Sequence, residues 1–520
     1  MSAQATFSLE RARRRFGSFE NIAACGPLAV VSVTVGGLAV GAFLWYAAVT
    51  HADFGPGASD AAFVAALGVG LVGVFTLWYG YAAYFARRAD VGLITALRYD
   101  APTWAAFAIA AVGLVSPIAV GSPARLAAIA LGVFVLAKIG VAARFVPTVR
   151  DVLVAFIVTR VAIIVVAELA ATVIAQRPGL HVAESTNPLL AVWGRWDAVH
   201  YLDIARRGYY GTDMAFFPLY PALIRLVGGA LGNDLFGGLL VSNAALFFGL
   251  LFFYKLVEHQ YTRSVARRAI FYVSIFPTAI FFSAVYPESL FFALSLASFY
   301  YIREHRWLTA GIIGTFASLT RVEGVLLFVP YVIEAYAAAG NGRAWKPIIA
   351  TRGRAARLIA GAVLIPLGLV AYMAILWVLR GDPLYFSHVQ AHWDRHLAPP
   401  WASLMHAYRT IAHGLHGHAP ALVAGQTIEL AFTFLMIAIL IAGIKRLRAS
   451  FSAYMALSIL VPMSTSSLMS MPRFALVLFP MFVILALWGA RPWVNNVVVA
   501  FSLSLLGLFT VFFSDWYWVA

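Results

Sequence analysis

Residues 61–85, AAFVAALGVGLVGVFTLWYGYAAYF, form a run of 25 residues that contains no charged side chain. A helix that crosses the hydrocarbon core of a bilayer needs about 20 such residues. Similar runs recur along the 520-residue chain, which is 62% hydrophobic and 11% charged, whereas soluble domains carry roughly a quarter charged residues. The pattern therefore predicts an all-α polytopic membrane protein, since a β-barrel would show short alternating segments instead.

We expect about 15 transmembrane helices. Their apolar runs lie near residues 26–49, 60–85, 102–120, 124–143, 151–175, 234–254, 269–286, 289–302, 307–320, 323–339, 358–379, 424–444, 452–468, 474–489 and 493–513. The first run is too long for a signal peptide, so we expect a retained helix. The run 216–230 is short and contains Pro218, Pro221 and Arg225, which predicts a helix lying on the membrane surface.

The basic residues orient the chain in the membrane. With residues 216–230 on the surface, the N-terminal tail and the basic loops fall on one side and hold 25 of the 37 lysines and arginines. Because such residues stay in the cytoplasm, we expect a cytoplasmic N-terminus and an external C-terminus. Topology also explains most of the net charge of +15, so no nucleic-acid partner is expected. A single cysteine, Cys25, excludes an intrachain disulfide.

The external stretch WGRWDAVHYLDIARRGY, residues 193–209, combines aromatic and ionisable residues. If residues 196–207 are helical, Asp197, His200 and Tyr201 share one face of that helix. A carboxylate beside aromatic rings at the membrane surface suits a general base that acts on a sugar hydroxyl. The alternative is an interfacial belt, in which the tryptophans and tyrosines anchor the chain and the charges are loop residues.

Three more charged residues fall at external helix ends. Glu288 follows Pro287, so it is either a second site carboxylate that positions the acceptor or polarises a donor group, or a helix N-terminal charge, and both roles are compatible. Arg321 and Arg473 could bind a phosphate through paired hydrogen bonds. Arg473 could instead be a snorkelling residue at the interface. Rare charges that gather on one side of a membrane protein indicate a site.

The segment 388–418 is rich in histidine. Its members are His388, His392, His396, His406, His413, His416 and His418. His392, Asp394 and His396 could bind a metal, but their spacing matches no common metal site. We therefore expect no metal and no cofactor, and interpret the segment as an external loop over the site that contacts the acceptor.

WDAVHYLDIARRGY, residues 196–209, followed by AFFPLYP, residues 215–221, resembles the PIG-V-like mannosyltransferase family of GT-C membrane glycosyltransferases. Further stretches resemble the family in the same order: IFPTAIFFSAVYPESL (275–290), ASLTRVEG (317–324), GDPLYF (381–386) and MPRF (471–474). The resemblance covers roughly residues 150–520. The chain departs from the family pattern at Val322 and Glu323, where a small polar residue and Asn are usual, and by four extra helices at its N-terminus.

The resemblance implies a GT-C-like helical bundle with external juxtamembrane helices. It also implies an inverting transfer of a sugar, mannose in this family, from a polyprenyl-phosphate donor to a glycolipid, glycan or protein acceptor on the non-cytoplasmic face. Carried over by position, Asp197 is the catalytic base. Glu288 is its catalytic partner, and the expected substrate-binding residues are Trp196, His200, Tyr201, Arg321 and Arg473.

The predicted organisation has four segments. Residues 1–147 are accessory membrane helices with four spans, and residues 148–379 are the catalytic membrane module, which includes an external Trp-Asp loop at 176–233. Residues 380–423 are the external histidine-rich loop, and residues 424–520 are the C-terminal membrane helices. The Gly- and Ala-rich, cysteine-poor composition favours a bacterial plasma membrane.

A transporter or lipid flippase is the competing interpretation. It predicts ionisable residues near the bilayer midplane and broken helices paired between two related halves. The sequence shows neither feature. A structural scaffold would leave the external grouping of Asp197, Glu288, Arg321 and Arg473 unexplained.

Overall fold

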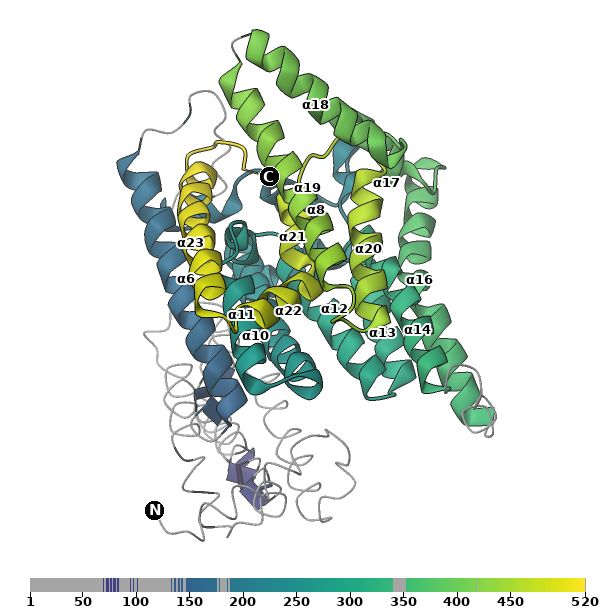
Figure 1. Cartoon of the computed structure of the whole chain (residues 1–520). Coiled ribbons are helices and arrows are strands. Elements are labelled where there is room, and N and C mark those ends of the chain that lie inside the picture. The colour runs from purple at the N-terminus through teal and green to yellow at the C-terminus, as the bar shows by residue number, and fades with distance from the viewer. Residues whose placement is uncertain are drawn as a thin grey trace, which may run out of the picture. The chain divides into compact units, whose positions relative to one another are not determined.

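The computed structural model describes residues 146–174, 188–339, 352–417 and 419–519, with Arg177, Ser185 and scattered residues between 69 and 143. The described residues form helices and turns, and they contain no strand beyond one bridge between Leu397 and Thr465. The chain divides into two compact units, Met1–Arg150 and Asp151–Ala520. The first four predicted spans lie outside the continuously described residues, so the account below concerns the second unit (Figure 1).

The helices follow one another in this order, with η marking 3-10 helices. The first group is α6 (Pro147–Val173), α7 (Pro188–Ala191), η3 (Val192–Gly194), α8 (Ala198–Arg207), η4 (Gly211–Ala215), α9 (Leu219–Leu231), α10 (Asp234–Gln260), α11 (Arg263–Ser274), η5 (Ala279–Phe282), α12 (Glu288–Arg303), α13 (Trp307–Ser318), η6 (Val322–Leu327) and α14 (Phe328–Ala338). The second group is α16 (Arg352–Arg380), α17 (Tyr385–His388), η7 (Val389–Trp393), α18 (Pro400–His416), α19 (Pro420–Gly443), α20 (Ala449–Met463), α21 (Met471–Val477), α22 (Phe479–Trp488) and α23 (Pro492–Ser514).

Five helices of the described part are long and apolar enough to cross a membrane, namely α6, α10, α16, α19 and α23. The pair α21 and α22, bent by 74° at its break, makes a sixth span if it is counted as one. These findings support a polytopic helical membrane protein. The predicted number of about 15 spans is not confirmed.

Four of the predicted spans lie outside the continuously described residues, and interrupted helices account for part of the remaining difference. The predicted run 269–286 is helical only to Ser274, where α11 ends, and then continues through turns and η5 around Pro277. Similarly, the run 323–339 begins as the 3-10 helix η6 before the 11-residue α14. Proline lacks an amide hydrogen and clashes with the preceding turn, so an apolar run that contains it need not be one helix.

The predicted surface helix corresponds to α9. Its 13 residues extend about 20 Å, which is too short to cross a hydrocarbon core of about 30 Å. One face buries Tyr220 and Ile224, and the other exposes Leu226. On the same side as the site, α18 lies across the ends of α19 and α20 (Figure 1).

Two glycines allow α13 and α16 to pack closely. A Cβ atom on Gly311 would meet the backbone of Gly361, and a Cβ atom on Gly361 would meet the Trp307 carbonyl and the Tyr331 hydroxyl. Small residues at such crossings let membrane helices approach each other. This contact fixes the helix that leads into Arg321.

Gly361→Ala is therefore expected to lower the thermal stability of the purified protein by about 1–3 kcal/mol, the usual cost of overpacking a filled interior. Gly353→Ala is the matched control, because Gly353 lies on the same helix with nothing within 4 Å of its added Cβ atom. The measurement is the thermal unfolding midpoint in detergent. Equal midpoints for the two variants would contradict the packing argument.

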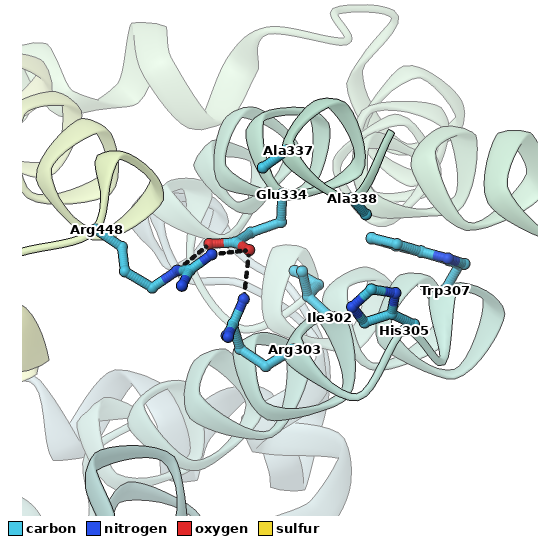
Figure 2. Close-up of a pocket in the computed structure, with 8 residues that line it drawn as sticks. All are labelled: Ile302, Arg303, His305, Trp307, Glu334, Ala337, Ala338 and Arg448. Atoms are coloured by element: carbon cyan, nitrogen blue, oxygen red, sulfur yellow. Dashed lines mark hydrogen bonds and ion pairs between the residues drawn. The ribbon is translucent and has the colours of Figure 1, made fainter. Parts of the chain in front are cut away.

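An ion cluster around Glu334 joins α12, α14 and α20 (Figure 2). The Glu334 carboxylate accepts from Arg303 Nη1 at 2.8 Å, from Arg448 Nε at 3.0 Å and Nη2 at 3.1 Å, and from Ser450 Oγ at 2.5 Å. Beside it lies a cavity of about 210 Å³. Arg303 and Glu288 mark opposite ends of the 16-residue α12, about 22 Å apart along its axis, so this cavity is remote from the predicted site.

Candidate active site

Arg473 joins two of the predicted site carboxylates. Its Nη1 donates to Asp197 Oδ2 at 2.6 Å, and its Nε and Nη2 donate to Glu288 Oε1 at 3.1 and 2.8 Å. Its guanidinium also stacks 5.0 Å from the ring centres of Phe281 and Tyr286. The structure therefore brings together residues that lie as many as 276 positions apart in the sequence.

Arg321 extends this ion cluster on the other side of Glu288. Its Nη1 donates to Glu288 Oε1 at 2.8 Å, and its Nε and Nη2 donate to the two Glu323 oxygens at 3.4 Å. Glu323 is the residue at which the chain departs from the family pattern, and it supplies a carboxylate where that pattern has Asn. The cluster thus holds three carboxylates, from Asp197, Glu288 and Glu323, and two guanidinium groups.

The two catalytic candidates, Glu288 and Asp197, differ in how far their side chains are buried. Glu288 is 0% exposed, and its Oε2 has no hydrogen-bond partner in the described part of the chain. The Asp197 side chain is 24% exposed, and Arg473 is the one described residue that hydrogen-bonds to its carboxylate. A buried charge is stable only when it is paired. Glu288 therefore holds the arginines, whereas Asp197 is the carboxylate that a substrate can reach.

The backbone before Asp197 is held in a strained turn. Trp196 has φ 61°, a left-handed conformation that costs a non-glycine residue about 1–3 kcal/mol. The Asp197 amide donates to Tyr286 Oη at 3.1 Å, and Tyr286 Oη donates to the Arg195 carbonyl at 3.1 Å. Immediately afterwards α8 begins, with Asp197 as its N-cap residue. This turn fixes the direction in which the Asp197 carboxylate points.

The turn that presents Arg473 is fixed in a similar way. Ser470 has φ 73°, and Glu429 from α19 accepts the amide hydrogens of Ser470 at 3.0 Å and Met471 at 2.8 Å. Thr278 Oγ1 donates to the Pro472 carbonyl at 3.0 Å. Two neighbouring elements therefore position the first turn of α21, and with it the Arg473 guanidinium.

His200 and Tyr201 lie beside the ion cluster, and no hydrogen bond within the described residues joins them to it. His200 Nδ1 lies 2.7 Å from Asp213 Oδ1, and its ring stacks on Phe216. Tyr201 is 5% exposed and packs edge-on against Phe216 and Tyr220. Burial raises the pKa of Tyr201 well above its usual value. Both side chains are thus engaged in packing the wall of the site.

Arg395 is a further cation that the sequence analysis did not single out. No described residue hydrogen-bonds to its guanidinium, and its Nε is buried. Burial lowers the pKa of Arg395, and the nearby carboxylates of Glu323 and Glu429 oppose that effect. Basic residues are less common in external segments than in cytoplasmic ones. An arginine in a segment predicted to be external was therefore the feature of the sequence that could have identified Arg395.

The described histidines of the segment 388–418 pair with other groups of the protein or lie apart from one another. Where the structure is described, no group of three or more His, Cys, Asp or Glu side chains could hold a metal ion. His388 instead pairs with Asp382 at 2.7 Å, and His413 Nδ1 lies 2.8 Å from the Arg409 carbonyl. His418 lies outside the described residues.

Comparison with known proteins finds similarity to one family over part of the chain. The family model Mannosyltransferase (PIG-V) matches residues 140–337, a segment that includes Asp197, Glu288 and Arg321. GPI mannosyltransferase 2 from two strains of Cryptococcus neoformans var. neoformans serotype D is 33% identical over 84 residues, which are 14% of this chain. The match spans 20% of the length of those relatives. Over residues 140–337 the chain is therefore similar to the PIG-V mannosyltransferases, which confirms the family resemblance of the motifs in that segment.

Proposed function

We propose that this chain transfers mannose, with inversion, from a polyprenyl-phosphate donor to an acceptor hydroxyl on the non-cytoplasmic face of a membrane. The observation that supports this most directly is the partly exposed Asp197 carboxylate, held by Arg473 beside a buried ion cluster. The family match supports mannose as the sugar. A polyprenyl-phosphate donor rests on the motif resemblance, and the family match does not favour a transporter or flippase.

In the proposed reaction Asp197 is the general base. Its Oδ1 accepts the proton of the acceptor hydroxyl while the hydroxyl oxygen attacks the anomeric carbon of mannose. The bond from that carbon to the phosphate oxygen breaks, and polyprenyl phosphate leaves from the opposite side, so the configuration inverts. A base that serves this role lies about 2.6–3.2 Å from the proton donor. The Arg473 contact to Oδ2 leaves Oδ1 available for it.

Glu288 and Arg473 orient the base. Three hydrogen bonds fix the Arg473 guanidinium, one to Asp197 and two to Glu288. Small misplacement of a reacting group is costly because the reaction depends on near-attack geometry. We therefore assign Glu288 as a positioning residue that acts on Asp197 through Arg473.

The leaving phosphate needs a cation that is not already neutralised. Arg321 and Arg473 each donate three of their five N–H groups to carboxylates, and the cluster has one carboxylate more than it has guanidinium groups. Arg395 lies in electrostatic range of the same cluster with its guanidinium unpaired among the described residues. We assign Arg395 to the departing phosphate, assisted by the remaining N–H groups of Arg321 and Arg473.

Arg395→Gln is expected to raise the half-saturating donor concentration and to slow transfer, with about a 10- to 100-fold loss in catalytic efficiency. Arg409→Gln is the matched control, because it removes an exposed arginine from the helix that follows. The measurement is the donor dependence of mannose transfer by both purified variants. Equal donor dependence in the two would exclude Arg395 from phosphate binding.

The proposed arrangement places the catalytic membrane module at 148–379 and the C-terminal membrane helices at 424–520, with the external loop 380–423 between them and the N-terminus in the cytoplasm. The composition favours a bacterial plasma membrane, whereas the curated relatives that the chain matches are fungal. The test of the function is transfer from radiolabelled polyprenyl-phosphate mannose to total membrane lipid by the purified protein. Failure with that donor and other lipid-linked sugars would reject it.

A further inference from the structure

The cavity of about 210 Å³ at the far end of α12 takes no part in the proposed reaction (Figure 2). Its charged and aromatic lining residues are Arg303, His305, Trp307, Glu334 and Arg448. A single water molecule needs only about 10–15 Å³ of such space. The cavity can therefore hold a group that is much larger than a water molecule.

Both arginines of the cavity keep hydrogen-bond donors that a ligand can reach. Arg303 donates to Glu334 through Nη1 alone, and Arg448 donates to it through Nε and Nη2. Arg303 Nε and Nη2 and Arg448 Nη1 have no hydrogen-bond partner among the described residues, and none of these three atoms is buried. The Arg303 side chain is 17% exposed and the Arg448 side chain is 34% exposed. Their remaining N–H groups are therefore accessible.

The charges that line the cavity favour an anion. Two guanidinium groups face one carboxylate, and that carboxylate, Glu334, already accepts hydrogen bonds from both arginines and from Ser450. With His305 neutral, the lining carries one positive charge in excess. Glu304, the carboxylate next to Arg303 in the sequence, is exposed and lies in electrostatic range of Lys255. An anion in the cavity would therefore pair with a charge that Glu334 leaves uncompensated.

The helices beside the cavity suit a ligand that the membrane carries. Trp307 begins α13 and Ala338 ends α14, and both residues line the cavity. Each of these helices exposes an apolar row at intervals of four residues, which places the row on one face: Leu308, Ile312 and Phe316 on α13, and Phe328, Val332 and Tyr336 on α14. Apolar faces that end at a tryptophan and at arginines are typical of the boundary between the hydrocarbon core and the lipid headgroups. The cavity therefore lies where a lipid phosphate would be found.

We propose that this cavity binds a phosphate group, with Arg303 and Arg448 donating to its oxygens, and that an anionic lipid carries the phosphate. Arginine pairs with phosphate through several N–H groups at once, and basic pockets between membrane helices on the cytoplasmic side bind anionic headgroups. The proposed topology places this end of α12 in the cytoplasm. Glu334 holds both arginines at the cavity. The site is independent of the proposed mannosyl transfer.

The test follows the thermal unfolding midpoint of the purified full chain in detergent micelles that contain phosphatidylglycerol, which is anionic, or phosphatidylcholine, whose headgroup has no net charge. A ligand that binds only the folded state raises the midpoint as its concentration rises. Phosphatidylglycerol is expected to do so, and phosphatidylcholine is not. Arg303→Gln should raise the half-saturating amount of phosphatidylglycerol about 10- to 100-fold, the size of one lost hydrogen bond to a charged group. Arg446→Gln, which removes an exposed arginine outside the cavity, should match wild type.

Inorganic phosphate, added to phosphatidylcholine micelles, separates the two sources of the ligand. If it raises the midpoint of wild type and not that of Arg303→Gln, the site stands and a free phosphate is its ligand. Ala338→Phe fills the cavity from α14 and keeps its charged groups, so it should also lose the response to phosphatidylglycerol, and it replaces Arg303→Gln if that variant does not fold. A wild-type response in both variants would overturn the site, as would a wild-type midpoint that responds to neither phosphatidylglycerol nor phosphate.

Discussion

Asp197→Asn is expected to give a folded protein that transfers mannose about 10²- to 10⁴-fold more slowly than wild type, the usual contribution of a general base. The amide oxygen can still accept the hydrogen bond from Arg473 that the carboxylate accepts at 2.6 Å, so the ion cluster should persist. The amide cannot take up the proton of the acceptor hydroxyl. Donor binding should change little, because we assign the donor phosphate to residues other than Asp197.

The measurement compares transfer rates for wild type, Asp197→Asn and Asp203→Asn under saturating donor. Asp203 is the matched control because it lies on the same helix and pairs with the exposed Arg207 at 2.6 Å, away from the cluster. Thermal unfolding of each variant shows whether the fold is retained. Transfer by Asp197→Asn at the wild-type rate would remove Asp197 from the reaction and return the Trp-Asp loop to the role of an interfacial belt.

The long spans were predictable because hydropathy reports them directly. α10 and α16 contain uncharged runs at residues 235–254 and 358–379, which are 20 and 22 residues long and match the length needed to cross the hydrocarbon core. The interrupted elements were not predictable in the same way. Residues 275–287 remain apolar while the backbone leaves the helix, and hydropathy does not distinguish an apolar turn from an apolar helix.

The sequence could predict which residues belong to the site, but it could not predict which of them form ion pairs with one another. Charges are expensive in a membrane, so Asp197, Glu288, Arg321 and Arg473 could be recognised individually. Which arginine meets which carboxylate depends on how α12 and α21 pack, and sequence spacing contains no information about that contact. Arg395 was missed because its surrounding histidines suggested a different chemistry.

Arg321 and Arg473 were predicted to bind a phosphate, and the structure shows that both also have carboxylate partners, which were not predicted. That difference has a physical reason. A guanidinium that is buried without a ligand must be neutralised by the protein, or its desolvation would destabilise the fold. Glu288 meets this need for both Arg321 and Arg473 through one oxygen atom, Oε1.

Glu288→Gln is therefore expected to destabilise the protein by about 3–5 kcal/mol, the cost of removing one partner from a buried ion pair. Arg473 would keep only Asp197 as a charged partner, and Arg321 would keep only Glu323. Transfer should also slow, because Arg473 would no longer hold Asp197 in one orientation. The measurements are the thermal unfolding midpoint and the rate of mannose transfer.

A double variant separates these two effects. Glu288→Gln combined with Arg473→Met also removes the guanidinium that has lost its hydrogen bonds to the Glu288 carboxylate, so its stability should lie above that of Glu288→Gln alone, whereas its transfer rate should stay low. The control is Glu334→Gln, which breaks a similar three-partner ion cluster at the other end of α12. Glu334→Gln should lower the thermal unfolding midpoint. In the protein that remains folded, the transfer rate should depend on acceptor and donor concentration as in wild type. If Glu288→Gln shows only the stability loss of this control, Glu288 does not position the base, and the orientation of Asp197 depends on Tyr286 and the strained turn at Trp196.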